Sequence, residues 1–253
     1  MANNKKYFFG NTEVSKEEKV KKVNEVFDSV AKRYDIMNDI LSLGAHRLWK
    51  EILVNSISNI ISSRKEFCYL DLACGTGDIG YKLLDKKLKN INVLMMDINE
   101  KMLEQATKRK EYREHKKNID FIVSDAENIP LASNSIDCIA IAFGIRNVAS
   151  IENALLEINR VLKCGGKFLC LEFSNVEVPL LKKFYSFYSK NIIPEIGSYV
   201  VKDRRSYQYL VESIERFPKQ DELTDLFTKS GFINSKYTNL SGGIACIHSG
   251  WKM

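Results

Sequence analysis

A glycine-rich segment that follows a short apolar run near residue 70 carries the clearest chemical signal in the sequence. Gly75, Gly77 and Gly80 form a G-x-G-x-x-G pattern, and Asp97 lies twenty residues beyond Gly77. In a strand–loop–helix unit, such glycines let the backbone approach a bound nucleotide, and an acidic residue ending the next strand can hold two ribose hydroxyls. The pattern predicts a nucleotide site, and alone it fits a nicotinamide dinucleotide.

Carboxylates around this loop decide which ligand fits. A dinucleotide places its pyrophosphate at the start of the helix, where Asp71 and Asp78 would repel it. S-adenosylmethionine has a ribose and an adenine but no phosphate, and carboxylates attract its ammonium and sulfonium. We expect Asp71 to reach the ammonium, Asp97 the ribose diol, and Asp125 with the Ala126 backbone the adenine edge. Asp78 keeps a second interpretation, as a cap of the following helix.

Helical patterns surround this segment. Ser15 and Glu18 form a capping-box pattern, and apolar residues at helical spacing continue as far as Tyr34, which predicts an amphipathic first helix. A second helix is predicted over 46–61. A further helix, capped by Ser150, is predicted to end at Cys164-Gly165-Gly166, and the last helix is predicted over 218–230.

Short apolar runs between the helical patterns predict strands. They cover residues 67–73, 92–97, 120–124, 135–142 and 167–173, and a hairpin is predicted from 232–237 and 244–251 around Ser241-Gly242-Gly243. Helices between successive strands require crossover connections. We therefore expect an α/β fold with a parallel sheet finished by an antiparallel edge.

Several stretches resemble a known family. Residues 71–77 resemble motif I of the class I S-adenosylmethionine-dependent methyltransferases. Residues 34–39 with 44–50, and residues 160–174, are similar to the two signatures of the ubiquinone/menaquinone biosynthesis C-methyltransferases, and 143–148 also match. The resemblance extends from about residue 26 to 251. This chain departs from the family pattern at Cys74, where Gly is usual, at Cys164, where Pro is usual, and at Ala142, where Ser is common.

The resemblance implies a class I methyltransferase Rossmann-like fold, in which helices cover both faces of a mostly parallel seven-stranded sheet with an antiparallel edge strand. It implies a single domain over 1–253, with a helical lid (1–62), a cofactor-binding core (67–175), an insertion (177–217) and a C-terminal helix and hairpin (218–253). S-adenosylmethionine is the expected cofactor, and no metal is expected. Cofactor contacts are expected at Tyr34, Asp71, Gly75, Thr76, Gly77, Asp97, Ile98, Asp125, Ala126 and Ala142.

Methylation of a quinol ring carbon requires deprotonation of a neighbouring hydroxyl, and the resemblance suggests Arg146 and Asn147 as the catalytic residues. Arg146 is too basic to accept the proton, but its cation can stabilise the phenolate and polarise a water. Asn147 can orient that water or a quinol oxygen. The resemblance also places Asn38 and His46 in the lid, whereas Trp49 fits a structural role equally well.

Composition limits the partners. The apolar share of 45% is that of a globular protein, and the formal charge of +6 arises from dispersed lysines, which does not favour nucleic-acid binding. No apolar run approaches the ~20 residues that span a bilayer. The six cysteines show no metal-binding spacing. We expect a cytoplasmic protein with a polyprenyl quinol substrate; a homodimer stays open.

The insertion is rich in aromatic and basic residues. Phe184, Tyr185, Phe187, Tyr188, Ile192 and Ile193 lie between Lys182-Lys183 and Arg204-Arg205. This composition suits peripheral contact with the inner face of a membrane or with a quinone-biosynthesis complex, and packing on the sheet fits equally well. Three other functions remain as alternatives: an NAD-dependent oxidoreductase, an RNA or other small-molecule methyltransferase, and a non-catalytic scaffold.

Overall fold

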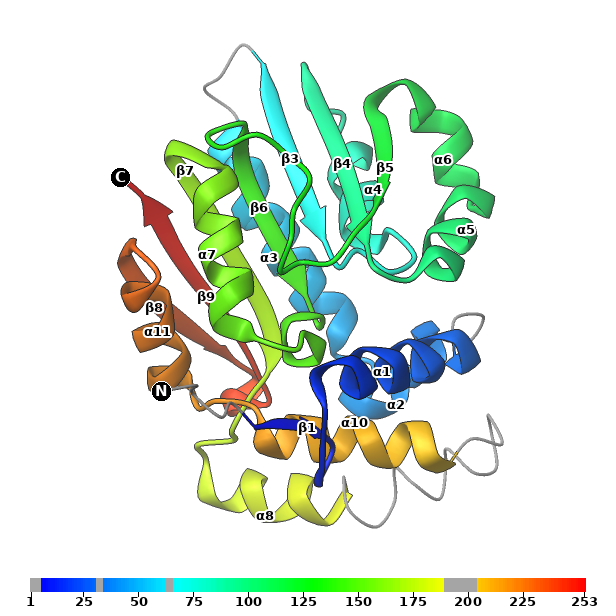
Figure 1. The fold of residues 1–253 in the computed structure, drawn as a ribbon, viewed down its shortest axis with the longest axis vertical. Helices are drawn as coiled ribbons and strands as arrows, with labels where there is room; N and C mark the ends of the chain where they lie inside the picture. Colours follow the sequence, from blue (N-terminus) through cyan, green and yellow to red (C-terminus); the bar gives the residue numbers. More distant parts are fainter. Residues whose placement is uncertain (1–5, 31–33, 62–65, 189–203) are drawn as a thin grey trace.

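The computed structural model describes residues 6–30, 34–61, 66–188 and 204–253. Its centre is a seven-stranded sheet with the order β5-β4-β3-β6-β7-β9-β8 (Figure 1). Strands β3 to β7 are parallel, and β9 runs antiparallel to its neighbours β7 and β8. The expected mixed sheet is confirmed, and its antiparallel strand lies one position inside the edge strand β8. The strands are β3 (Phe67–Leu72), β4 (Ile91–Asp97), β5 (Ile119–Val123), β6 (Ile136–Ala142), β7 (Leu162–Phe173), β8 (Phe232–Leu240) and β9 (Ala245–Lys252).

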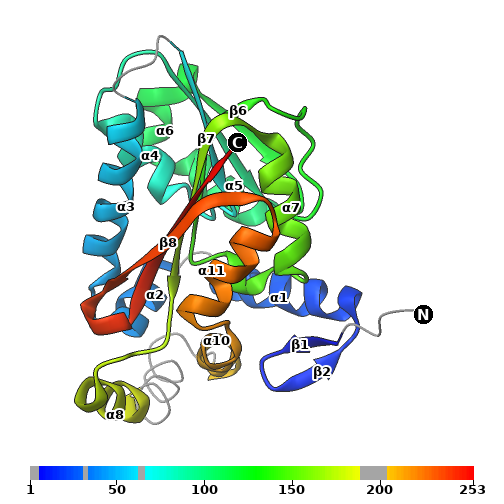
Figure 2. The same ribbon diagram turned by 90° about the vertical axis from the view of Figure 1, so that its left-hand side faces the viewer.

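Helices cover both faces of the sheet. Helices α3 (His46–Ile61) and α4 (Asp78–Asp85) pack on one face, and α7 (Ile151–Val161) and α11 (Gln220–Lys229) pack on the other (Figure 2). Along β3, Tyr69 joins the apolar cluster of the first face and Leu70 that of the second. Because both faces are buried, the central strands are largely apolar, and the sequence predicted β3 to β6 to within one residue at each end. Strand β7 begins at Leu162, five residues before its predicted start at 167.

Helix α5 (Glu100–Lys108) lies beside β4 and β5, and a separate group of elements gathers below the carboxyl ends of the parallel strands (Figure 1). They are α1 (Lys16–Val30), α2 (Tyr34–Ser42), α8 (Pro179–Phe187) and α10 (Arg204–Arg216), with a small hairpin of β1 (Tyr7–Phe9) and β2 (Thr12–Val14). The hairpin was not predicted. It packs on α10, where the ring of Phe9 stacks on Tyr209 at 4.2 Å and the Asn11 amide donates to Glu212. Strands of three residues are too short to show a period.

Two predicted boundaries were wrong. The capping box at the start of α1 is present, because the Glu18 amide donates to Ser15 Oγ at 3.1 Å, but α1 ends at Val30 and Tyr34 begins α2. The Cys164-Gly165-Gly166 turn lies inside β7, whereas α7 ends at Val161. Gly165 has a φ of +73° where the pairing of β6 with β7 shifts register, so it forms a bulge and does not cap the helix.

The insertion contains α8 and α10, and residues 189–203, which include Ile192 and Ile193, lie outside the described residues. Tyr185 and Tyr188 are only 8% and 6% exposed, which supports the packing interpretation over membrane contact for these two side chains. Tyr188 instead donates to the carbonyl of Ile40 in α2 at 2.6 Å. Phe187 is 61% exposed. Within the described ranges, no helix is both long and apolar enough to cross a membrane.

Candidate active site

The glycine loop is held by the ends of two neighbouring strands. The Gly75 amide donates to Asp97 Oδ2 at 2.7 Å, and the Cys74 amide donates to the carbonyl of Met96 at 3.0 Å. Strands β3 and β4 pair in parallel, so their carboxyl ends meet at one edge of the sheet. Gly75 and Gly77 have φ values of +57° and +78°, a conformation that favours glycine. This loop is the turn that the G-x-G pattern predicted.

A cleft opens beside the loop, at the carboxyl ends of the strands. It brings together six of the predicted residues: Gly75, Asp97, Ile98, Asp125, Ala126 and Asn147. Helix α1 covers it with Val20, Val23, Asn24 and Phe27. The sequence identified α1 only as amphipathic, so these contacts were missed.

The charged residues of the described cleft lining are all acidic. Asp97 and Asp125 line it, and no Lys or Arg is among the described residues of the lining. A ligand with a pyrophosphate would find no cation there, whereas a ligand with a ribose diol and positive charges would be favoured. The residues therefore fit S-adenosylmethionine and disfavour a dinucleotide.

Asp97 is placed to accept hydrogen bonds. It is 8% exposed, and its two oxygens accept from the amides of Gly75 (2.7 Å) and Asn99 (2.8 Å). Burial raises the pKa of Asp97, and these amide hydrogen bonds oppose the rise. Each carboxylate oxygen has a further lone pair for a ligand hydroxyl.

Asp71 lies behind the loop. It is 1% exposed, its Oδ2 accepts from the Gly80 amide at 2.9 Å, and it is absent from the cleft lining. Burial raises its pKa to about 7, although the Gly80 amide opposes the rise. Asp71 therefore supports the loop in this structure, and its approach to a ligand ammonium, directly or through a water, stays a prediction.

Three other predicted cofactor residues, Thr76, Gly77 and Ala142, are absent from the cleft lining. The side chain of Tyr34 lies outside the described part of the chain, so its contact with the cofactor stays a prediction. A Cβ on Gly77 would lie 2.8 Å from the ring of Tyr81, so this glycine lets the loop pack closely on α4.

Phe143 is a cleft residue that the sequence did not single out. It follows β6, lines the cleft and has a φ of +58°. This left-handed conformation is strained for a bulky residue, and such strain is frequent at functional sites. Its ring packs on Phe173 at 4.9 Å and on Trp49 at 6.4 Å. The only signal in the sequence was its place in the matched segment 143–148.

Arg146 is not a free cation. It belongs to the short helix η3 (Ile145–Asn147), and its Nη1 lies 2.5 Å from Glu172 Oε1 and 2.7 Å from the carbonyl of Phe143. The side chains of Arg146 and Glu172 are each 1% exposed. Arg146 also lines a second cavity, of about 570 Å³, beneath the β1–β2 hairpin. The expected stabilisation of a phenolate by Arg146 must therefore involve Glu172.

Asn147 faces the cleft itself. Its Oδ1 accepts from the Tyr209 hydroxyl at 2.9 Å, and its Nδ2 lies 3.4 Å from the carbonyl of Phe143. The bond to Tyr209 fixes the amide orientation and directs the donor group Nδ2 toward the Phe143 side. Asn147 lines the cleft, and its role in orienting a water or a quinol oxygen stays a prediction.

Polar residues of α2 and α3, the segment predicted as a lid, contact one another. His46 is 2% exposed, and its Nε2 lies 2.8 Å from Asp39 Oδ1, while Asn38 is fully buried. Burial lowers the pKa of His46, which keeps the ring neutral at pH 7. Trp49 is 1% exposed and donates to Ser241 Oγ at 2.9 Å. The structural interpretation of Trp49 is the one that its contacts support.

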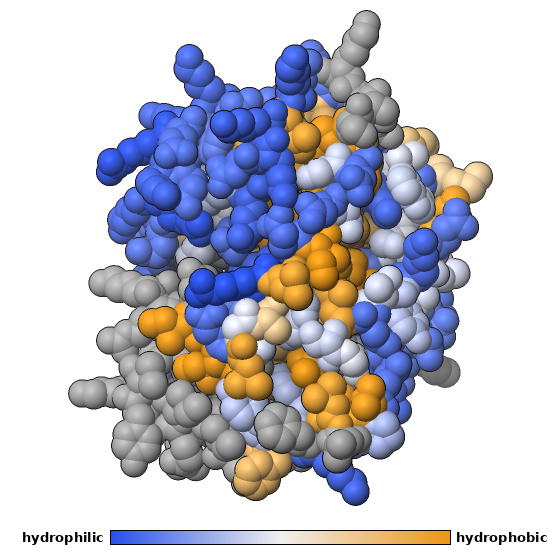
Figure 3. Space-filling view, turned by 180° about the vertical axis from the view of Figure 1, so that it is seen from behind, coloured by the Kyte–Doolittle hydropathy of each residue, from blue (hydrophilic) through white to orange (hydrophobic). Residues whose placement is uncertain are grey.

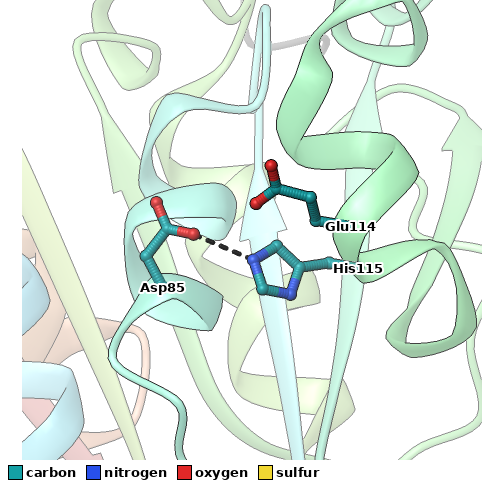
Figure 4. Close-up of side chains that lie close together, drawn as sticks. All are labelled: Asp85, Glu114 and His115. Carbon is teal, nitrogen blue, oxygen red and sulfur yellow. Dashed lines mark hydrogen bonds and ion pairs between the residues drawn. The ribbon is translucent and has the colours of Figure 1, made fainter.

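A separate group of potential metal ligands lies at the opposite edge of the sheet. Asp85 ends α4, and Glu114 and His115 end α6 (Lys110–His115) (Figure 4). Ligand atoms of all three lie within 4.8 Å of one another, and His115 Nε2 lies 2.8 Å from Asp85 Oδ1. The two acidic residues are exposed. The group is remote from the cleft because α4 begins at the glycine loop and runs away from it.

Comparisons with known proteins agree with this geometry. The sheet order and the acidic cleft at its carboxyl edge define a class I S-adenosylmethionine-dependent methyltransferase. Solved SAM-dependent methyltransferases share the fold: one from Aquifex aeolicus has a TM-score of 0.59 at 18% identity, covering 89% of this chain and 98% of its own. One from Thermotoga maritima has a TM-score of 0.58 at 21% identity, covering 91% of this chain and 100% of its own.

The family follows from the sequence matches. The model of the ubiE/COQ5 methyltransferase family matches residues 12–252. Two relatives, each named ubiquinone/menaquinone biosynthesis C-methyltransferase UbiE, come from Rhizobium meliloti and Rickettsia bellii. The first is 46% identical over 97% of this chain and 94% of its own length, and the second is 47% identical over 97% and 98%. The chain belongs to the ubiE/COQ5 methyltransferase family.

Proposed function

We propose that this protein transfers a methyl group from S-adenosylmethionine to a ring carbon of a polyprenyl benzoquinol, of demethylmenaquinol, or of both, in ubiquinone/menaquinone biosynthesis. The observation that carries the proposal is the cleft at the carboxyl edge of the sheet, which is lined by Asp97 and Asp125 and, among the described residues, by no Lys or Arg. Membership of the ubiE/COQ5 family supplies the reaction class.

In this proposal Asp97 holds the ribose diol, and Asp125 with the backbone of Ala126 contacts the adenine edge. Gly75 lets the backbone approach the ligand, and Ile98 packs beside it. Bound S-adenosylmethionine supplies an electrophilic methyl group on its sulfonium. Asp71 stabilises the loop through Gly80 and adds negative charge behind the site of the ammonium.

The quinol ring is assigned to the end of the cleft formed by Phe143 and Asn147. Phe143 gives an apolar wall for the ring, and Asn147 can orient a ring oxygen. Alignment of the ring carbon with the methyl and sulfur atoms can supply about 7–11 kcal/mol of the barrier reduction. The cover formed by α1 excludes water from this path.

We further propose that the protein collects its substrate at a membrane surface. The exposed apolar residues Leu43 (62%), Leu48 (62%) and Phe187 (61%) belong to the end of the lid and to α8. Figure 3 shows apolar surface across the middle and lower part of the face on which α3 lies. Exposed Lys183 and Arg205 can contact anionic head groups. A quinone-biosynthesis complex is the alternative source of substrate.

Two experiments test the reaction. Purified protein with labelled S-adenosylmethionine should transfer methyl to demethylmenaquinol or to the demethyl benzoquinol, and comparison of the rates identifies the ring. Cells that lack the protein should accumulate the corresponding demethyl quinone. Binding of NAD with no binding of S-adenosylmethionine would contradict the proposal, and methylation of RNA with no methylation of quinol would assign a different methyltransferase activity.

A further inference from the structure

The proposed reaction requires an acceptor for the hydroxyl proton, and this inference rests on that proposed function. The carboxylates that line or support the cofactor cleft already accept hydrogen bonds. Asp97 accepts from the amides of Gly75 and Asn99, and Asp71 from that of Gly80. Asp78 pairs with Lys50 at 2.9 Å. The acceptor must be a carboxylate near Asn147 that has one oxygen without a hydrogen-bond partner among the described residues.

Glu172 meets this condition. Glu172 is the penultimate residue of β7, at the carboxyl edge of the sheet, and it is 1% exposed. Its Oε1 accepts from Arg146 Nη1 and from the Phe173 amide at 2.9 Å. Its Oε2 is buried and has no hydrogen-bond partner within the described ranges, and neither has Arg146 Nε. A buried carboxylate oxygen without a partner is unfavourable, so it indicates a position where a hydroxyl or a water completes the site.

The position of the pair connects Glu172 with the quinol end of the cleft. Arg146 Nη1 also donates to the carbonyl of Phe143, and the Phe143 ring packs on that of Phe173. Phe143 and Asn147 line the cleft on either side of Arg146 in the chain. Glu172 therefore lies directly behind the wall against which the proposal places the quinol ring.

We propose that Glu172 accepts the quinol hydroxyl proton at Oε2 through one water, and that Arg146 holds the carboxylate in place. The ring O–H bond breaks and its proton passes through the water to Glu172. The ring carbon forms its bond to the methyl group while the methyl–sulfur bond breaks, with that electron pair staying on sulfur. Loss of the proton from the methylated ring carbon to water restores the aromatic ring as a phenolate. Glu172 then returns its proton through the water to that oxygen, so the carboxylate is regenerated and one proton is released overall.

Charge provides the physical reason for this arrangement. Before the transfer, Arg146 and Glu172 form a neutral pair, which the protein can bury. After the transfer Glu172 is neutral, so the Arg146 cation is uncompensated at the moment when the phenolate forms nearby. The cation is thus available only when negative charge develops, which favours the transition state over the ground state.

The surroundings of Glu172 also suit an acceptor. Burial raises its pKa, while the Arg146 cation and the Phe173 amide oppose the rise. The higher pKa brings the carboxyl closer to the phenol value of about 10. The other titratable groups that feel its charge are Tyr209 from α10 and Cys170 from β7, and burial raises the pKa of both, so they stay neutral at pH 7.

The test is Glu172→Gln, which preserves size and can still accept from Arg146 but cannot take a proton. We expect turnover to fall at least 100-fold, while the S-adenosylmethionine Kd changes less than twofold. A quinol analogue with an acidic, already ionised hydroxyl should recover most of the lost rate, because it needs no acceptor. Wild-type turnover in this variant, or an equal defect with the ionised analogue, would overturn the inference.

A second measurement uses the unmodified protein, in case Glu172→Gln does not fold. The acid limb of its pH–rate profile should stay at the same pH for two quinols whose hydroxyl pKa values differ, because the limb belongs to the enzyme. A limb that moves with the substrate pKa would refute the role of Glu172. Absence of quinol methylation by the wild-type protein would instead contradict the proposed function, so the two failures are distinguishable.

Discussion

Lys50 of α3 and Asp78, the first residue of α4, form an ion pair that joins the lid to the cofactor loop. Lys50 Nζ lies 2.9 Å from Asp78 Oδ2, and the side chains are 4% and 21% exposed. The N-cap of α4 is Gly77, which makes no side-chain cap, so Asp78 does not cap its helix. The sequence showed a carboxylate beside the loop, and the structure shows that a lid cation neutralises it.

Replacement of Lys50 by Met should lower the free energy of unfolding by about 1–3 kcal/mol, because it leaves a largely buried carboxylate without its main cation. Arg109, at 3.7 Å from Asp78, limits the loss. Urea denaturation at pH 7 measures it, and the double variant K50M/D78N should recover most of it. The control is Lys86→Met, since the Lys86–Glu51 pair is exposed and should change stability by less than about 1 kcal/mol. Equal losses in the two single variants would contradict the buried-pair interpretation.

The same pair predicts a pH dependence. Burial alone would raise the pKa of Asp78, but the charge and hydrogen bond of Lys50 lower it overall. A depressed acid pKa contributes stability above the unfolded value of about 3.9, and that contribution is lost as the pH falls through the folded pKa. The stability difference between wild type and Lys50→Met should therefore shrink below about pH 4.

The core of the fold could be predicted because its signals are local. Strands β3 to β7 are continuous apolar runs separated by helical patterns, and Ser15 and Ser150 cap their helices as expected. The β1–β2 hairpin could not be predicted, because it is defined by its contact with α10, about two hundred residues away in the chain. The bulge at Gly165 was missed because the pairing of β7 with β6 overrides the local glycine signal.

The candidate site likewise contains residues that local sequence signals predict and residues that only distant contacts define. The glycine loop and Asp97 follow from spacing, and six predicted residues do line the cleft. The partner of Arg146 could not be predicted, because Glu172 belongs to β7, 26 residues away in the chain. In the sequence, nothing about Glu172 indicates which cation it pairs with. Contacts between distant segments also decided the burial of Tyr185 and Tyr188, because the aromatic composition of the insertion fitted membrane contact and internal packing equally well.

Asp97→Ala should weaken S-adenosylmethionine binding by about 1.5–3 kcal/mol, the range for hydrogen bonds to a charged group. The variant also leaves the Gly75 amide without its acceptor, which loosens the loop. Calorimetry at pH 7 gives the affinity. Asp120→Ala is the matched control, because Asp120 is an exposed carboxylate near the start of β5. Unchanged affinity in a folded Asp97→Ala protein would remove Asp97 from the cofactor site.

Gly77→Ala and Gly165→Ala form a matched pair. Their φ values are +78° and +73°, so both substitutions carry the same backbone strain of about 1 kcal/mol. A Cβ at Gly77 meets the Tyr81 ring at 2.8 Å, whereas at Gly165 nothing lies within 4 Å. We expect Gly77→Ala to lose a further ~1–3 kcal/mol of stability and to weaken cofactor binding. Equal stability in the two variants would show that close packing at Gly77 is unimportant.

The raised pKa of Asp71 predicts a pH-dependent affinity for the cofactor. Burial places this pKa at about 7, so the free protein holds a substantial fraction of protonated Asp71 at pH 6. A bound cation favours the ionised form, so binding should release a proton and the affinity should rise between pH 6 and 8. Asp71→Asn should abolish this rise. Calorimetry in buffers of different ionisation enthalpy measures the released proton, and identical profiles for both proteins would count against Asp71.

Phe187 should contribute to membrane contact, because it is 61% exposed on α8 near the exposed Lys183 and Arg205 of the insertion. Insertion of one aromatic ring and up to ~1 kcal/mol from each basic residue give weak, salt-sensitive attachment. Liposome flotation at low salt should show binding to anionic vesicles, about tenfold weaker in Phe187→Ser and weaker again when Lys183 and Arg205 are changed to Gln. Leu156→Ser is the control, since Leu156 is similarly exposed, at 55%, on α7 over the sheet. No binding of the wild type, or equal loss with Leu156→Ser, would leave delivery of the quinol by a partner protein as the explanation.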